Sequence, residues 1–317
     1  MLVTSENVKL AFKGLRTIFT QRLAQAAVVQ RWTEFATRME SSGDEEDYDF
    51  LLAIGGLQEL LGEIAVDNLR AAGLTIKNKD FHKTIGVPVR TIRHDKLSLL
   101  TPAVQLMAIR ANQHPLRLAT QLLGEGFDTK DYCGSNFFAT DKVEYKGAAK
   151  FTNLVTTALT QASYEAARAK LRAMNDDKGE SLFLGEELVM VVPPELESQA
   201  NKILLTENYP MAVTTGAENV ITGISGGGTN VNKGTAKPIV LPGLSAYSKT
   251  AWYLLDTSLP IKPLIVQFDY EPIQNQVTNP EDSYVVTHQA FIYQILAGMG
   301  AGYAAPRLII GSTGVTS

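Results

Sequence analysis

The chain has 317 residues, of which 45% are hydrophobic, and its formal net charge is −4. This composition predicts a folded protein with a large core and excludes a disordered chain. The slightly acidic balance argues against a dedicated nucleic-acid-binding protein, whose affinity comes mainly from Lys and Arg at phosphates. A single cysteine, Cys133, excludes an intrachain disulfide and a cysteine-based zinc site. No apolar run approaches the roughly 20 residues that a membrane-spanning helix needs, so we expect no membrane contact.

The first predicted element is a helix near the N-terminus, which Thr4 or Ser5 can cap. One face carries apolar residues at helical spacing, namely Val8, Phe12, Leu15 and Phe19. The opposite face carries four basic residues, namely Lys9, Lys13, Arg16 and Arg22. Such a face is either solvated or a docking surface for another protein.

An acidic surface loop is predicted at 41–49, and a second helix follows it. Its apolar face consists of Leu57, Leu60, Leu61 and Ile64. Gly73 is placed to end this helix, because glycine readily adopts the left-handed conformation that closes helices.

Two short alternating segments, 74–79 and 84–90, predict a β-hairpin. In the second segment Ile85, Val87 and Val89 point to one side, which is the pattern of a half-buried strand. An isolated two-stranded hairpin is marginal in water, and nothing nearby in the sequence covers its apolar face. We therefore expect a neighbouring subunit to cover it, so that Val87→Asp would leave the subunit folded but block assembly.

A long helix is predicted over 96–123, with a break or kink at His114-Pro115. Two apolar stripes run along it, one through Leu97, Leu100, Val104, Met107 and Ala111, the other through Leu99, Ala103, Leu106 and Ile109. Two apolar faces predict a helix that is covered on both sides.

The remainder predicts helices and strands in mixed order. Thr160 caps a helix, a strand covers 188–192, and Pro193-Pro194 opens another helix. The Gly-rich region 214–243 predicts loops, and further strands are predicted at 251–255, 264–268 and 284–295. This order is typical of an α+β or α/β protein.

The sequence motifs show no set of residues with the spacing of a catalytic site. The run Gly223-Ile-Ser-Gly-Gly-Gly228 lacks the spacing of a dinucleotide fingerprint and the Gly-Lys-Ser/Thr end of a P-loop. The four histidines show no metal-binding spacing, and Cys133 has no local histidine. We therefore expect no enzyme activity, no cofactor and no metal.

Four stretches resemble one known family, the major head (capsid) subunits of Mu-like bacteriophages. They are Val3-Thr4 with Phe12, Gly14 and Phe19; 69–81; Gly126-Phe127 with Gly134, Asn136-Phe137-Phe138 and Thr140-Asp141; and Ala301-Gly302-Tyr303 with Gly311-Ser312. Ala139 and Lys142 depart from that family's pattern. The resemblance spans nearly the whole chain.

The resemblance implies the α+β Hong Kong 97-type capsid fold. Its expected parts are an N-terminal arm (1–45), a helix with an extended hairpin loop (46–95), a peripheral domain with a spine helix (96–156), an axial domain (157–282) and C-terminal strands that return to the peripheral domain (283–317). Candidate inter-subunit contacts lie on the arm and the hairpin, namely Phe12, Leu15, Phe19, Ile76, Phe81, Ile85, Val87 and Val89.

The implied function is that of a major capsid protein, which assembles in the bacterial cytoplasm into hexamers and pentamers of an icosahedral virion shell. Implied partners are copies of itself, a separate scaffolding protein, a maturation protease, a portal and weakly held double-stranded DNA. Two alternatives stay open at this point. One is an encapsulin-type compartment with protein cargo, and the other is an α/β enzyme that binds a phosphorylated ligand at Gly223–Gly228.

Overall fold

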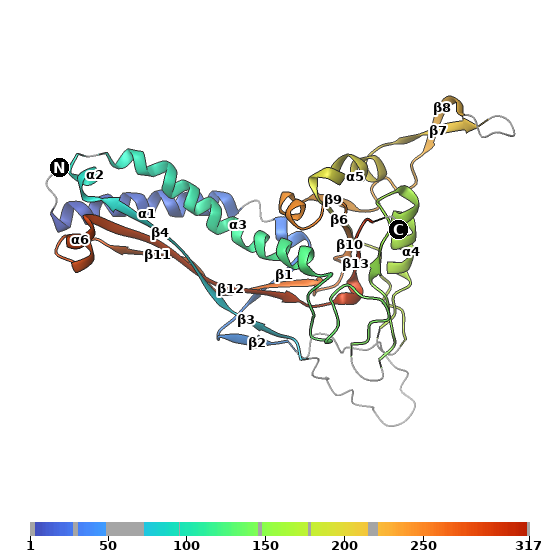
Figure 1. Cartoon of the computed structure of the whole chain (residues 1–317), viewed down its shortest axis with the longest axis horizontal. Coiled ribbons are helices and arrows are strands. Elements are labelled where there is room, and N and C mark those ends of the chain that lie inside the picture. The colour runs from blue at the N-terminus through green and yellow to red at the C-terminus, as the bar shows by residue number, and fades with distance from the viewer. Residues whose placement is uncertain are drawn as a thin grey trace, which may run out of the picture. The chain divides into compact units, whose positions relative to one another are not determined.

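Helices and strands follow one another in mixed order, as expected for an α+β protein (Figure 1). The structure is a computed structural model that describes residues 4–27, 31–48, 73–94, 96–144, 148–176, 179–214 and 221–315. The helices in these ranges are α1 (Ser5–Ala27), α2 (Val89–Arg93), α3 (Thr101–Glu125), α4 (Gln161–Arg172), α5 (Glu197–Leu204) and α6 (Ser283–His288). The strands are β1 (Ala36–Glu40), β2 (Glu45–Asp47), β3 (Thr75–Lys77), β4 (Lys79–Pro88), β5 (Leu154–Val155), β6 (Leu188–Val192), β7 (Asn208–Thr214), β8 (Ile221–Thr229), β9 (Lys237–Val240), β10 (Trp252–Asp256), β11 (Leu264–Val277), β12 (Ala290–Tyr303) and β13 (Ile309–Ser312).

The chain forms two compact units, each built from three separate segments. Unit 1 contains Met1–Asp47, Thr75–Ala119 and Ile265–Gly302, and unit 2 contains Tyr48–Leu74, Thr120–Leu264 and Tyr303–Ser317. The chain passes between the units within α3, β11 and β12. The segments 157–282 and 283–317 therefore each contribute residues to both units. The capsid roles assigned to the five sequence segments stay predictions.

Unit 1 is a four-stranded sheet in the order β1-β11-β12-β4, packed against α1 and α3 (Figure 1). The strands β4 and β12 pair antiparallel, with Val87 opposite Phe291 and Ile85 opposite Tyr293. The predicted apolar face of α1 lies in the core of this unit, where Phe12 contacts the rings of Phe291 and Tyr293. Burial of these large side chains stabilises the helix against the sheet, by about 1.5–3 kcal/mol per side chain.

The strand pairing of segments 74–79 and 84–90 was predicted wrongly. β3 pairs with β2, and β4 pairs with β12, so the two segments are not partners in a hairpin. The apolar face of β4 is covered by α1 and α3 of its own chain, and residues of the neighbouring strand β12 belong to the same core cluster. The main strand partner of β4 begins at Ala290, about 200 positions away, so no local pattern in the sequence indicates the pairing.

The long helix α3 differs from its prediction in two respects. It runs without interruption from Thr101 to Glu125 with Pro115 inside it, and a 3₁₀ turn at Leu97–Leu100 precedes it. Only one of its stripes is covered, because Val104, Met107 and Ala108 are buried in the core of unit 1. The second stripe is largely open to solvent, with Leu99 71% and Leu106 53% exposed, while Ile109 is half-buried.

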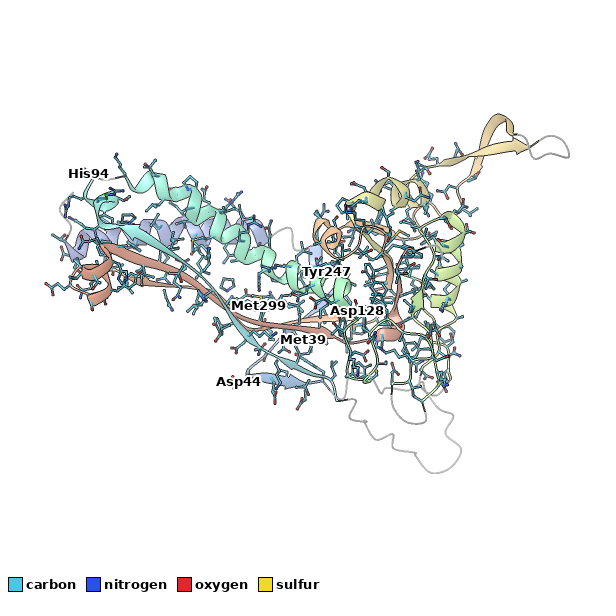
Figure 2. The ribbon with its side chains drawn as sticks, in the orientation of Figure 1. Met39, Asp44, His94, Asp128, Tyr247 and Met299 are labelled. Atoms are coloured by element: carbon cyan, nitrogen blue, oxygen red, sulfur yellow. The ribbon has the colours of Figure 1, made fainter. Side chains whose placement is uncertain are left out.

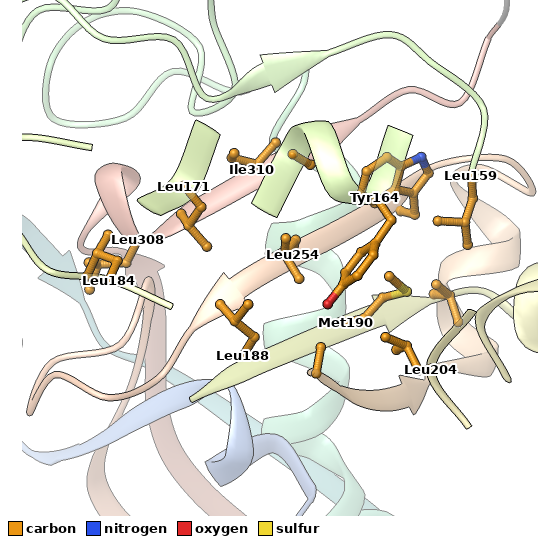
Figure 3. Packing of buried hydrophobic residues seen from close by; sticks show 14 of the residues in the cluster. Leu159, Tyr164, Leu171, Leu184, Leu188, Met190, Leu204, Leu254, Leu308 and Ile310 are labelled. Atoms are coloured by element: carbon orange, nitrogen blue, oxygen red, sulfur yellow. The ribbon is translucent and has the colours of Figure 1, made fainter. Parts of the chain in front are cut away.

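Unit 2 contains a five-stranded sheet in the order β5-β13-β10-β6-β9. β10 pairs antiparallel with β13 and β6, whereas β6–β9 and β13–β5 are parallel. The helices α4 and α5 supply Tyr164, Leu171 and Leu204 to the core against this sheet (Figure 3). The predicted cap is confirmed, because the Thr160 hydroxyl accepts the amide of Ser163 in a reciprocal capping box.

Two further predictions about local structure were wrong. The run Gly223–Gly228 lies in strand β8, which pairs with β7, so the region is not a loop throughout. Residues Ser283–His288 form the short helix α6, which Asp282 caps, and the strand there starts only at Ala290. In β8, pairing with β7 outweighs the preference of glycine for loops. In α6, capping by Asp282 favours a helix where the residue types predict a strand. The second predicted helix, with Leu57, Leu60, Leu61 and Ile64, lies outside the described residues.

Replacing Gly311 or Gly14 by alanine is expected to have opposite effects on stability. A Cβ at Gly311 would lie 2.6 Å from Cδ1 and Cε1 of the buried Phe138 ring, whereas a Cβ at Gly14 in α1 meets nothing within 4 Å. We expect Gly311→Ala to destabilise unit 2 by about 1–3 kcal/mol through overpacking. Gly14→Ala should stabilise unit 1 by about 0.5–1 kcal/mol, because alanine loses less backbone entropy in a helix.

The two tryptophans allow each unit to be followed separately, because Trp32 lies in unit 1 and Trp252 in unit 2. Urea unfolding followed by Trp252 fluorescence in a Trp32→Phe background measures the stability of Gly311→Ala. Unfolding followed by Trp32 fluorescence in a Trp252→Phe background measures the stability of Gly14→Ala. Equal midpoints for Gly311→Ala and its parent would contradict the close packing of Phe138.

Candidate functional site

The eight candidate contact residues fall into two groups by burial. Five are buried within their own chain, namely Phe12, Leu15, Phe19, Ile76 and Val87. The other three are half-buried, namely Phe81, Ile85 and Val89. A side chain that its own subunit already covers has little area left to bury on association. Contact between these eight residues and a neighbouring subunit stays a prediction, and its best candidates are the half-buried three.

The half-buried residues also have partners within unit 1. The Phe81 ring packs on the imidazole of His114, with 4.1 Å between ring centroids, and Ile85 and Val89 pack at the margin of the core. Val87 itself is 0% exposed. Its burial changes the expectation for Val87→Asp, because an aspartate there would enter the core of unit 1.

The surfaces left open in unit 1 include the outer faces of α1 and α3, from which side chains project (Figure 2). On α1 the exposed face is basic, since Lys9, Lys13, Arg16 and Arg22 are all exposed. Leu10 lies within this basic face and is 64% exposed. On α3 the exposed stripe is apolar, as described above. These two faces can make contacts with another molecule without any rearrangement of the core.

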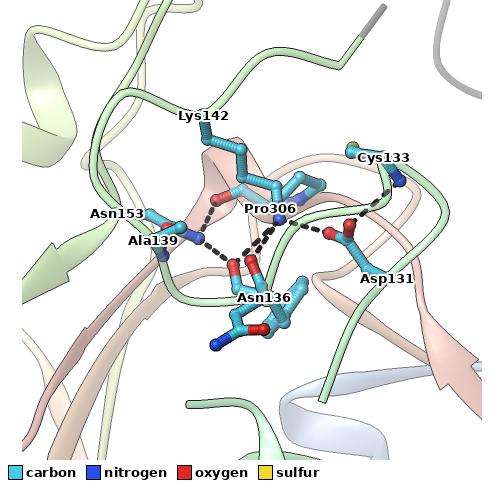
Figure 4. A network of polar contacts seen from close by, with 8 residues as sticks. Asp131, Cys133, Asn136, Ala139, Lys142, Asn153 and Pro306 are labelled. Carbon is cyan, nitrogen blue, oxygen red and sulfur yellow. Dashed lines mark hydrogen bonds and ion pairs between the residues drawn. The ribbon is translucent and has the colours of Figure 1, made fainter. Parts of the chain in front are cut away.

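The Gly126–Lys142 stretch encloses a buried ion pair (Figure 4). The Lys142 ammonium pairs with the Asp131 carboxylate, and both side chains are 0% exposed. The ammonium also donates to the backbone oxygens of Asn136 (2.9 Å) and Phe137 (3.1 Å). All three donors of the lysine therefore have acceptors, which is the condition under which a buried charge is tolerated.

Asn153 links this stretch to the C-terminal part of the chain. Its amide nitrogen donates to the backbone oxygens of Phe137 (2.9 Å) and Pro306 (3.1 Å), and its side-chain oxygen accepts the amide of Ala139. The ring of Phe137 stacks on Tyr303 at a centroid distance of 4.2 Å. Asn153 thus holds distant segments of unit 2 together, which explains this polar network without a substrate.

Sequence reasoning missed the ion pair and the role of Asn153. In the sequence, Lys142 stands out only as a departure from the pattern of the resembled family. Its partner Asp131 lies 11 positions earlier in an irregular segment, where no helical or strand spacing relates the two. The departure was the only available signal, because a charged residue with a buried partner has no local sequence pattern.

The positions of the described side chains and strands also bear on metal and ligand binding. Within the ranges that the structure describes, no three His, Cys, Asp or Glu side chains lie close enough together to hold a metal ion. The backbone of the Gly223–Gly228 run takes part in the β7–β8 ladder. No described helix is both long and apolar enough to cross a membrane.

The thiol of Cys133 is protected from reaction by its surroundings. Burial raises the pKa of Cys133 to about 12, and the nearby Asp131 carboxylate contributes to the same shift. Because the thiolate is the reactive form, we expect native Cys133 to alkylate at pH 8 at least about 100-fold more slowly than in urea. The native rate should then rise about tenfold per pH unit toward pH 10. Mass spectrometry of iodoacetamide-treated samples measures both rates, and equal rates in buffer and urea would contradict the burial of the thiol.

The sequence is similar to those of known phage head proteins. The family model described as Mu-like prophage major head subunit gpT matches residues 8–157, 150–244 and 230–315. The major capsid protein of Escherichia phage Mu is 29% identical over 145 residues, which cover 46% of this chain and 47% of that protein. The Mu-like prophage FluMu major head subunit of Haemophilus influenzae is 29% identical over 139 residues, or 44% of each chain. The alignments thus span about half the length of these curated relatives.

Solved structures are similar over a larger share of the chain. The procapsid protein of bacteriophage JBD30 has a TM-score of 0.54 at 21% identity, covering 96% of this chain and 76% of that one. The capsid protein of the native GTA particle has a TM-score of 0.53 at 9% identity, covering 90% and 89%. At such low identity these matches show the fold, and they confirm the predicted α+β phage-capsid fold of the Hong Kong 97 type. The family match extends over nearly the whole chain, and the chain therefore belongs to the Mu-like prophage major head subunits.

Proposed function

We propose that this chain is the major capsid protein of a tailed double-stranded DNA phage or prophage. It self-assembles into the hexamers and pentamers of an icosahedral shell that encloses the genome, and it has no catalytic role. The observation that carries the proposal is the family match, which runs in order through both units from residue 8 to residue 315. The α+β capsid fold supports it independently.

The division of the chain into self-contained cores suits such a subunit. Each unit buries its own aromatic and aliphatic side chains, so the subunit is able to fold before it meets its neighbours. Assembly then uses surfaces that stay exposed, such as the outer faces of α1 and α3. Modest contacts of this kind add up in a shell, because each subunit is held by several others at once.

Further partners belong to the proposal. They are a separate scaffolding protein, a maturation protease and a portal, with double-stranded DNA held weakly inside. The net charge of −4 suits weak contact with the genome, because tight binding needs a surplus of basic residues at phosphates. The location is the virion, after assembly in the cytoplasm of the bacterial host.

The test is the assembly state of the purified full-length chain, with and without co-expression of the genes beside it. Sedimentation velocity and negative-stain microscopy should show closed shells or capsomer rings. A small oligomer under every condition, with a melting temperature raised by nucleotides or sugar phosphates, would overturn the proposal in favour of an enzyme. Shells that enclose a protein cargo instead of DNA would overturn it in favour of an encapsulin-type compartment.

A further inference from the structure

Phe183, between α4 and β6, combines two unusual properties. Its backbone φ is 51°, in the left-handed region that bulky residues rarely adopt. Its side chain is 85% exposed, the highest exposed fraction of any large apolar side chain in the described part of the chain. An aromatic ring is thus held outward in water by a backbone conformation that is itself unfavourable. Burial in the subunit explains neither property.

The backbone on both sides of Phe183 is held firmly by unit 2. Leu182 packs against the core and donates its amide to the backbone oxygen of Met174 (3.1 Å). Leu184 is buried among the core residues (Figure 3), and the next amide, that of Gly185, donates to the Asp256 carboxylate. With both neighbours anchored inward, the ring of Phe183 points away from the core. A rigidly presented ring loses little conformational entropy when a partner covers it.

The exposed side chains near Phe183 in the sequence are mainly acidic, although the Arg172 guanidinium also donates to the backbone oxygen of Gly185 (3.5 Å). Glu180, Glu186 and Glu187 are all exposed within four positions of it. The basic face of α1 has the opposite character, with Lys9 and Lys13 around the exposed Leu10. Gly14 lies one helical turn from Leu10, and a Cβ there would meet nothing within 4 Å, so the surface beside the leucine is open. The surface at Phe183 therefore presents an exposed aromatic ring among mainly acidic side chains. The surface at Leu10 presents an exposed leucine among basic side chains.

We propose that Phe183 is an anchor for contact between copies of this chain, docking beside Leu10 on α1 of a second copy. The proposal rests on the proposed function, because it specifies one of the contacts from which the shell is built. Aromatic side chains are frequent centres of binding energy, and complementary charges around them set the register of docking. Two different patches in contact give a head-to-tail arrangement, which closes into rings when the rotation between copies allows it.

The decisive variant is Phe183→Gly, because glycine is free to adopt a positive φ and removes the ring. Trp252 fluorescence in the Trp32→Phe background, at a concentration below assembly, should show a melting temperature of unit 2 that is unchanged or higher. The concentration at which copies associate in sedimentation velocity should rise about tenfold or more, as expected for loss of an anchor. Val231→Ala is the matched control, since Val231 is 72% exposed without an unusual backbone, and it should leave association unchanged.

A charge exchange tests the receiving surface. Lys13→Glu and Glu186→Lys should each weaken association, and the combination of both should restore much of it. If the wild-type chain forms shells and Phe183→Gly associates as strongly as the wild type, Phe183 is not an anchor, and the proposed function is unaffected. If the double variant associates no more strongly than either single variant, α1 is not the surface that receives Phe183. A wild-type chain that never self-associates would overturn the proposed function and this contact together.

Discussion

Lys142→Met is expected to lower the free energy of unfolding of unit 2 by about 3–5 kcal/mol, the range for removing one partner of a buried ion pair. The substitution keeps the length and most of the volume of the side chain, so the loss is mainly electrostatic. It leaves the Asp131 carboxylate at 0% exposure, where it still accepts the backbone amide of Cys133 but no longer faces a positive charge from Lys142. It also leaves the backbone oxygens of Asn136 and Phe137 without the ammonium. Urea unfolding followed by Trp252 in the Trp32→Phe background measures the loss.

Two further variants test whether the loss of stability comes from the burial of the ion pair or merely from the removal of one positive charge. Lys233 forms an ion pair with Glu207 at the surface, where the side chains are 47% and 77% exposed, and Lys233→Met should change stability by less than about 1 kcal/mol. Adding Asp131→Leu to Lys142→Met should recover part of the loss, because no uncompensated charge is then buried. A cost for Lys142→Met no larger than that for Lys233→Met would show that water reaches the buried pair.

The elements that sequence predicted well are those whose signals are local. The cap at Thr160 depends on Ser163 three positions later, and the buried face of α1 depends on apolar residues one turn apart. The strand β6 was visible as an uninterrupted apolar run, and all five of its residues are buried. In each case the residues that decide the structure lie within one or two helical turns of each other, so a single sequence contains the whole argument.

The features that sequence missed depend on distant partners. The apolar face of β4 looked uncovered because Phe291 and Tyr293, which pair with it, belong to the last part of the chain. The outer stripe of α3 looked like a core face because an exposed leucine and a buried one give the same periodicity. The anchor proposed at Phe183 has no sequence signal, since nothing in the run Leu182-Phe183-Leu184 indicates that its middle residue faces water. Resemblance to a family supplied the fold where these long-range relations could not be inferred.

Val87→Asp is the second substitution with a large expected effect, and its outcome distinguishes a core role from an interface role. Val87 is 0% exposed in β4, opposite Phe291, in the cluster that joins α1 and α3 to the sheet. The residues of that cluster are hydrophobic, so a carboxylate there would be buried among apolar side chains, and we expect unit 1 to lose more than about 4 kcal/mol, a magnitude typical of a poorly compensated buried charge. Trp32 fluorescence in the Trp252→Phe background, at a concentration too low for assembly, measures this loss.

The pH dependence supplies an independent check with a definite sign. Burial would raise the pKa of the new carboxyl in the folded state, so the folded chain would hold the proton more tightly than the unfolded chain. The destabilisation should therefore shrink as pH falls and grow as pH rises. Thr84→Asp is the matched control, because Thr84 is exposed on the same strand, and it should change stability by less than about 0.5 kcal/mol. If Val87→Asp instead left unit 1 as stable as Thr84→Asp does and still prevented assembly, Val87 would be an interface residue, and the core packing of β4 would have to be a feature of the assembled state alone.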